Sequence, residues 1–177
     1  MGANEKEMKL WIRDIAIALA IGLLLTQLIK PTIVREHSME ATLQEYDYII
    51  LNRQAYLFGE PKSGDIIVFH TDLVQANGKE KLLIKRIIGV PGDSISISDG
   101  KVYRNGEPLD EPYTLEGYTA SEMEEIIVPE DSLFVMGDNR QNSIDSRDSA
   151  VGFVSIDKIL GKATIRLYPF DKIGLLR

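Results

Sequence analysis

Cysteine is absent from this chain of 177 residues, and histidine occurs only at His37 and His70. The lack of cysteine excludes disulfide bonds, zinc thiolates and thiol nucleophiles together. The two histidines have no partner at the spacing of metal ligands, so we expect neither a metal site nor a cofactor. The formal net charge of -7 argues against nucleic-acid binding, because neutralising phosphates requires a basic surface.

Charge is also absent from residues 15–29, where only Thr26 and Gln27 are polar. This run of roughly fifteen residues is somewhat shorter than the twenty or so that span a bilayer comfortably. The flanking Arg13 and Lys30 have long side chains that can reach the headgroups from a slightly buried backbone. The run is apolar on every face rather than along one stripe, which favours a membrane anchor over a helix in a soluble core.

A cleaved secretory signal is the alternative for this run, but its small-x-small pattern at residues 18–20 lies in the middle of the run instead of after it. The positive residues before the run favour a cytoplasmic N-terminus, whereas Lys30 and Arg35 argue against it. We therefore predict a single-pass protein of the cell membrane. Residues 1–31 would form the cytoplasmic N-terminus and the transmembrane helix, and residues 32–177 an extracytoplasmic domain.

After the predicted anchor the sequence is typical of a β domain. Short runs rich in Ile, Val, Tyr and Phe predict strands at residues 46–51, 66–69, 82–90, 94–97, 101–104, 126–128, 133–136 and 163–168. Asp99-Gly100 and Asn105-Gly106 predict hairpin turns, because these residues tolerate positive φ. Residues 121–125 suggest one helical turn, and residues 154–160 a short helix or bend. We expect a mainly β fold, with antiparallel or mixed sheets forming a partly closed, barrel-like domain.

Ser38 is the candidate nucleophile, although a serine hydroxyl needs a base to take its proton. His37 is badly placed for this, because neighbours on an extended strand point to opposite faces. Lys85 lies in an apolar strand, where alternation puts Leu83 and Ile87 on its own face. Burial there would lower the pKa of the amine and make it a base. The alternative is an edge-strand lysine that blocks aggregation.

The polar segment at residues 137–147 is too polar for a core strand and too rich in Asp and Arg for a flexible linker. Asp138, Arg140, Asp145 and Arg147 could form an ion-pair lattice that holds the segment rigid. A calcium loop is the rival interpretation, but Arg140 stands where a ligand oxygen would be needed, so we reject it.

Four segments in this order, residues 38–43, 64–69, 85–93 and 137–147, resemble the type I signal peptidases of bacteria, and the compact length resembles the Gram-positive branch. The resemblance implies a serine endopeptidase with a Ser-Lys dyad, in which Ser38 attacks a peptide carbonyl and Lys85 is the general base. Lys85 would also activate the water that hydrolyses the acyl-enzyme. Ser143 matches the hydroxyl that orients the lysine amine, and Asp145 and Arg147 match its supporting network.

The same resemblance implies that the substrates are the signal peptides of exported preproteins, cleaved after small-x-small sites such as Ala-x-Ala. We also expect contact with the phospholipid membrane and work near the protein-export channel. An extended peptide would add along a strand edge, beside small apolar pockets. The residues predicted to line these pockets are Val34, Met39, Leu43, Leu83 and Ile84. Ordinary core packing is the alternative for all five.

Two positions depart from the family pattern. Ala41 stands where the family usually has proline, which predicts a less rigid turn after the nucleophile. Glu36 stands where the family has Gly or Ser, and a carboxylate there would repel a developing oxyanion unless it points to solvent. The backbone N–H of Ser38 is then the expected oxyanion donor, with the second donor unidentified.

Two other functions are compatible with these residues. One is a catalytically impaired, membrane-tethered β domain that binds peptides, which Glu36 favours. The other is a self-cleaving, repressor-type protease with the same dyad, which would need a DNA-binding module that the sequence does not contain.

Overall fold

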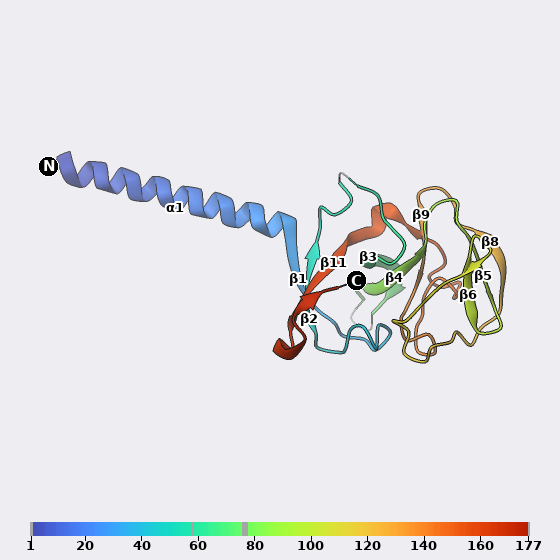
Figure 1. The fold of residues 1–177 in the computed structure, drawn as a ribbon. Coiled ribbons are helices and arrows are strands. Elements are labelled where there is room, and N and C mark those ends of the chain that lie inside the picture. Colours follow the sequence, from blue (N-terminus) through green and yellow to red (C-terminus); the bar gives the residue numbers. More distant parts are fainter. Residues whose placement is uncertain (1, 58, 76–77, 177) are drawn as a thin grey trace.

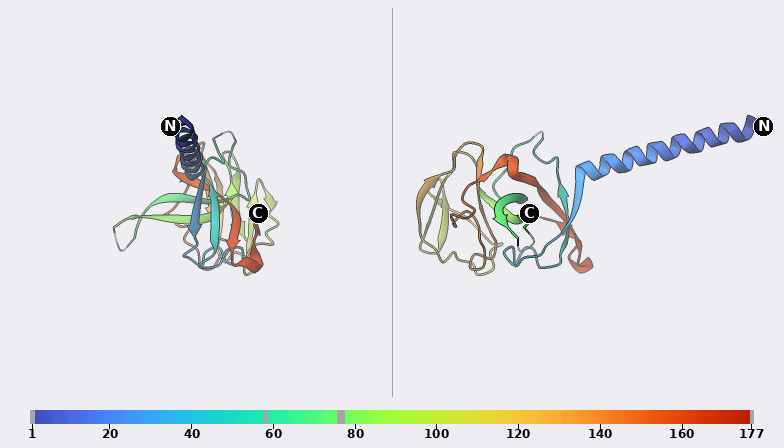
Figure 2. Two further views of the ribbon diagram at one scale, coloured as in Figure 1. Left: turned by 90° about the vertical axis from the view of Figure 1, so that its left-hand side faces the viewer. Right: turned by 180° about the vertical axis from the view of Figure 1, so that it is seen from behind.

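The computed structural model describes residues 2–57, 59–75 and 78–176, which form one long helix and a β domain (Figure 1). Helix α1 (Gly2–Leu28) projects away from the domain, as Figure 1 and the right-hand view of Figure 2 show. Its apolar side chains are exposed on all sides, including Trp11, Ile15, Leu19 and Leu23. Taking the described residues alone, no helix combines the length and the apolar character needed to cross a membrane. The transmembrane anchor therefore stays a prediction.

The larger sheet has eight strands, all joined by antiparallel pairing. Seven follow in the order β1 (Ile29–Ile33), β2 (Tyr48–Asn52), β11 (Ile159–Tyr168), β3 (Ile66–Val74), β4 (Glu80–Gly89), β9 (Ser132–Met136) and β10 (Val154–Ser155). The eighth, β12 (Gly174–Leu175), pairs with β11. Two short 3₁₀ helices flank β11, namely η1 (Ile156–Lys158) and η2 (Phe170–Lys172).

The smaller sheet lies at the end of the domain far from α1 (Figure 1). Its order is β7 (Glu107–Pro108), β6 (Lys101–Arg104), β5 (Ser94–Ser98) and β8 (Met123–Ile127). Asp99-Gly100 joins β5 to β6, and Asn105-Gly106 joins β6 to β7, with φ between 50° and 80° at all four residues. Both predicted turns are confirmed, because each needs two consecutive residues with positive φ.

The mainly β, antiparallel character is confirmed, while two finer expectations are not. The helical turn predicted at residues 121–125 is wrong, because Met123 begins strand β8 and pairs with Ile97. The larger sheet has two ends, β1 and β10, and among the described residues no pairing joins them. The partly closed, barrel-like shape is therefore unconfirmed. The bend predicted at residues 154–160 corresponds to β10 and η1.

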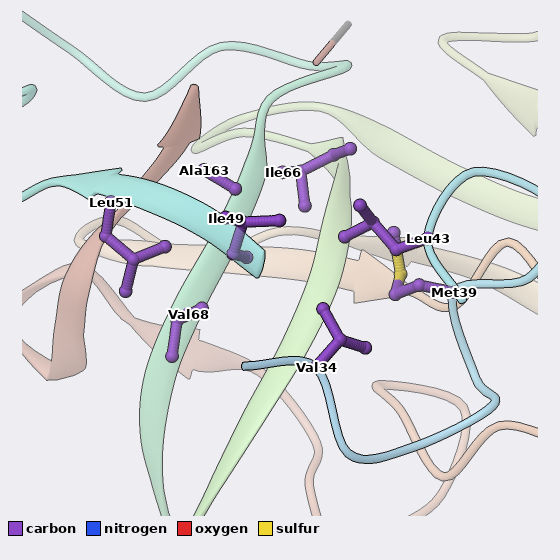
Figure 3. Close-up of a cluster of buried hydrophobic side chains, with 8 residues drawn as sticks. All are labelled: Val34, Met39, Leu43, Ile49, Leu51, Ile66, Val68 and Ala163. Carbon is purple, nitrogen blue, oxygen red and sulfur yellow. The ribbon is translucent and has the colours of Figure 1, made fainter. Parts of the chain in front are cut away.

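The core consists of three clusters of buried apolar side chains. The first contains Val34, Met39, Leu43, Ile49, Leu51, Ile66, Val68 and Ala163 (Figure 3). Met39 and Leu43 enter this cluster from the turn between β1 and β2. Val34 comes from the segment directly after β1, and the other residues come from strands β2, β3 and β11. This apolar contact holds the turn that carries Ser38 against the sheet.

Candidate active site

Ser38 lies at the start of a tight turn whose backbone is held at several points. The N–H of Glu40 donates to the carbonyl of His37 at 3.2 Å, and the N–H of Leu43 donates to the carbonyl of Met39 at 2.7 Å. Because Met39 and Leu43 are anchored in the core, the turn cannot move away from the sheet. Ser38 is only 6% exposed as a result.

Lys85 reaches Ser38 from strand β4, 47 residues further along the chain. Its amine Nζ is hydrogen-bonded to Ser38 Oγ at 2.6 Å and to the carbonyl oxygen of Ile84 at 3.1 Å. Lys85 is paired with Ile67 of the neighbouring strand β3, and its side chain is 0% exposed. The structure thus brings together the two residues predicted as nucleophile and base.

Burial is the main influence on the charge of Lys85, and it lowers the pKa of the amine to about 8. An ammonium ion loses its hydration when it is buried, which disfavours the charged form. The negative charges of Asp145, Glu36 and Asp138 oppose this effect, and Lys81 reinforces it. A lysine with this pKa is partly neutral near neutral pH and can act as a base.

Asp145 anchors the polar loop that follows β9. It is fully buried and accepts hydrogen bonds from the N–H of Gly137 at 3.0 Å and from Arg147 Nε at 2.8 Å. Burial by itself would raise the pKa of Asp145, but the bonds and charge of Arg147, with the Gly137 N–H, outweigh it, and the pKa lies below its ordinary value. Asp145 and Arg147 therefore shape the loop beside Lys85 as an ion pair.

Ser143, predicted to orient the lysine amine, has a buried Oγ that makes no ordinary hydrogen bond with any described residue. Among the groups that lower the pKa of Asp145, Ser143 ranks after Arg147 and the N–H of Gly137. Its hydroxyl packs where a side chain on Gly137 would be, next to the backbone carbonyl of Ser38. Ser143 is thus close to the nucleophile, and its role toward Lys85 stays a prediction.

Of the four residues predicted to form an ion-pair lattice, Asp145 and Arg147 pair with each other, whereas Asp138 and Arg140 pair with residues outside the segment. Asp138 pairs with Arg86 at 2.7 Å and also accepts a hydrogen bond from Thr42 Oγ1. Arg140 pairs with Glu111 at 2.6 Å. Arg86 follows Lys85 in β4, so Asp138 ties the strand of the base to the turn of the nucleophile.

Sequence reasoning did not assign a role to Arg86, Thr42 or Asn139. Asn139 holds the nucleophile turn directly, since its N–H donates to the carbonyl of Ser38 at 3.1 Å and its Nδ2 to the carbonyl of His37 at 3.2 Å. Of these three residues, only Arg86 could have been recognised from the sequence as needing a partner. Strand alternation places it on the face opposite Lys85, and a charged residue buried there requires a partner.

A groove of about 740 Å³ runs beside the dyad. Residues 32–36 line one side of it, and residues 79–84, which are Lys79 and the first half of β4, line the other. Val34, Leu83 and Ile84, three of the five residues predicted to bind substrate, line this groove, and their contact with substrate stays a prediction. Met39 and Leu43 do not line it. Their prediction as pocket residues is corrected, because the turn curls back and buries both completely in the core.

The chain matches the signal peptidase family, peptidase S26, over residues 8–168. It belongs to this family. It is 42% identical over 162 residues to the probable signal peptidase I-2 of Synechocystis, covering 91% of this chain and 72% of that protein. It is 32% identical over 182 residues to signal peptidase I S of Bacillus subtilis, covering 97% and 95%. A solved signal peptidase I from Enterococcus faecalis is 30% identical with a TM-score of 0.45, covering 59% of this chain and 97% of that one.

Membership of the signal peptidase family confirms the resemblance seen in the sequence and makes the protein a serine protease that removes signal peptides. In this signal peptidase the Glu36 carboxylate does not point freely into the groove. It forms an ion pair with Lys81 at 2.6 Å, so its charge is partly neutralised. His37 instead pairs with Glu40 at 2.8 Å on the exposed side of the turn, where it cannot serve Ser38.

Proposed function

We propose that this signal peptidase cleaves preproteins with a Ser38–Lys85 dyad through an acyl-enzyme. The observation that carries the proposal is the 2.6 Å hydrogen bond between a hydroxyl and an amine that are both withdrawn from water. Neutral Lys85 takes the proton of Ser38 as Oγ attacks the peptide carbonyl, and the resulting ammonium gives that proton to the leaving amine. Lys85, which is then neutral again, removes a proton from the water that hydrolyses the acyl-enzyme ester on Ser38.

The groove supports an extended substrate that runs past the dyad. A peptide there adds along the edge of β4, and the backbone N–H of Ser38 is the proposed donor to the oxyanion. Val34, Leu83 and Ile84 give this part of the groove an apolar lining, which is compatible with the small apolar side chains of small-x-small sites. The pairing of Glu36 with Lys81 gives this carboxylate a positive partner, which weakens the argument for an impaired enzyme.

We further propose that α1 attaches the protein to the cell membrane as a single-pass anchor, with the β domain outside and close to the export channel. The exposed apolar side chains of α1 support the attachment. The exposed side chains of Tyr48, Tyr168 and Phe170 add to it, and their rings contact one another edge to face at 6.3 and 5.4 Å. They lie around η2 (red in Figure 1), at the end of the domain from which α1 leaves. Aromatic side chains are enriched where membranes meet water.

The test is cleavage of a fluorogenic Ala-x-Ala peptide by the full chain in detergent. We expect Ser38→Ala and Lys85→Ala each to reduce kcat by at least about a thousandfold, because either change removes the nucleophilic path. Ser96→Ala and Lys101→Ala, on β5 and β6 of the smaller sheet, are matched controls and should cleave at the native rate. Trapping of an ester on the Ser38 peptide by mass spectrometry supports the acyl-enzyme. Native activity of Ser38→Ala would overturn the proposal.

A further inference from the structure

The groove beside the dyad is bordered by two strand edges that have no neighbour on the groove side. β1 comes first in the larger sheet, and among the described residues it pairs only with β2. β4 pairs with β3 over residues 80–86, whereas its pairing with β9 begins only at Arg86. Among the described residues this edge of β4 has no partner strand before Arg86, so a peptide strand can add there, although the carbonyl of Ile84 already accepts a hydrogen bond from Lys85 Nζ.

One ion pair joins the two sides of this groove. Glu36 lies on one side, two residues before Ser38, and Lys81 lies on the other, four residues before Lys85 on β4. Glu36 Oε1 and Lys81 Nζ are 2.6 Å apart, with side-chain exposures of 36% and 32%. The pair therefore crosses the space into which a peptide strand must enter.

Stability does not account for this pair. Ion pairs with this degree of exposure contribute only about 0–1 kcal/mol, because water solvates the separated charges nearly as well. The same weakness makes the pair easy to open. A contact that costs little to break, placed across the entrance to a catalytic dyad, is suited to a function during substrate entry.

We propose that the Glu36–Lys81 ion pair is a strap across the groove that opens when a peptide enters, and that both residues are positioning residues which set the charge environment of Lys85. The inference rests on the proposed function of the groove and dyad. It assigns a role to Glu36, one of the two residues that depart from the pattern of the resembled family.

The charges that face Lys85 make the second part of the proposal testable. They come from Asp145 and Asp138 in the loop after β9, from Glu36 before the nucleophile and from Lys81 on β4. Burial lowers the pKa of Lys85 most strongly. Glu36 raises this pKa and Lys81 lowers it, so the two members of the strap act in opposite directions. Losing one member leaves the other unbalanced.

The experiment compares Glu36→Gln, Lys81→Met and the exchange Glu36→Lys with Lys81→Glu, all in the full chain, with an uncharged Ala-x-Ala peptide. We expect both single variants to lower KM by about two- to fivefold, because the peptide no longer has to open the strap. Raising salt from about 50 to about 500 mM should lower KM of the native protein, since salt screens exposed charges. The single variants lose this salt dependence, and the exchange restores it.

The pH profile of kcat/KM distinguishes an ion pair that influences the pKa of Lys85 from one that has only a structural role. The acid limb of kcat/KM should move to lower pH in Glu36→Gln and to higher pH in Lys81→Met, because the pKa of Lys85 falls in the first and rises in the second. The exchange should move it to lower pH, because Glu36 is the stronger of the two influences. Asp72→Asn, which breaks the exposed Lys158–Asp72 pair away from the groove, is the matched control and should change neither KM nor the profile.

Unchanged KM and coincident pH profiles in both single variants would overturn the strap, as would shifts of the acid limb in the same direction. These outcomes are distinct from failure of the proposed function, which appears as no cleavage by the native protein or as cleavage by Ser38→Ala.

Discussion

Lys85 is an ammonium ion in water, and its use as a base depends on the apolar strands around it. A pKa of about 8 predicts that kcat/KM rises about tenfold per pH unit below pH 8 and levels off above it, because only the neutral amine accepts the proton of Ser38. The measurement is kcat/KM on an uncharged peptide between pH 5 and pH 10. A plateau already present at pH 6 would exclude a lysine of this pKa as the base.

The same burial predicts a cost in stability. Because the pKa of Lys85 is lowered from 10.5 to about 8 on folding, the unfolded chain binds more protons than the folded one between these values. Stability therefore rises with pH across that window, and the full cost is present below pH 8. We expect Lys85→Met, an apolar side chain of similar length, to be more stable than the native protein at pH 7 by about 1–3 kcal/mol, as an order of magnitude.

Denaturant unfolding at pH 7 and at a pH well above 10.5 checks this expectation. The advantage of Lys85→Met should disappear at the higher pH, where the native lysine is neutral in both states. Lys101→Met, at an exposed position on β6, is the control and should give no such pH dependence. Equal stability of Lys85→Met and the native protein at pH 7 would contradict the burial cost.

At the scale of elements, the end of β9 and the nucleophile turn approach each other through Gly137. A Cβ at this position would collide with Ser143 and with the backbone carbonyl of Ser38. Gly137→Ala should therefore displace Ser38, and we expect kcat to fall by roughly a hundredfold, since misplacement by about 1 Å has effects of that size. Stability should fall by about 1–3 kcal/mol through overpacking.

The measurements for Gly137→Ala are peptide cleavage and the melting temperature. Gly174→Ala on β12 is the matched control, because a Cβ there meets nothing within 4 Å. Native cleavage by Gly137→Ala would mean that the turn can shift without loss of the dyad geometry.

The element predictions from the sequence succeeded where the signal is local. Strand β6 (Lys101–Arg104) has the predicted bounds, since two turns of positive φ limit it on both sides. β3 extends to Val74 and β4 begins at Glu80, so their hairpin is longer than predicted. The polar residues of this extension carry no β signal, and pairing between the two strands decides their structure.

For the whole molecule, α1 and the β domain have separate tasks. α1 has 27 residues, about 40 Å of helix, and it projects from the domain without covering its core (Figure 1). We expect removal of residues 2–27 to change the melting temperature of the β domain by less than a few degrees, and to abolish binding to phospholipid vesicles. Vesicle flotation and thermal unfolding by circular dichroism are the measurements. Equal flotation of the truncated and full chains would place the membrane contact in the β domain.

The sequence by itself determined most of the strands and the hairpin turns, because apolar runs and positive-φ residues are local properties. Ser38 and Lys85 were paired through the resemblance to signal peptidases, since the apolar strand alone also fitted an edge-strand lysine. The tertiary structure decided which charges pair and which side chains reach the groove. Asp138 lies against Arg86 rather than Arg140, Glu36 lies against Lys81, and Met39 is enclosed in the core. These outcomes depend on how distant segments are registered against one another. A buried charge takes the partner that the fold brings near it, and its position along the chain does not reveal that partner.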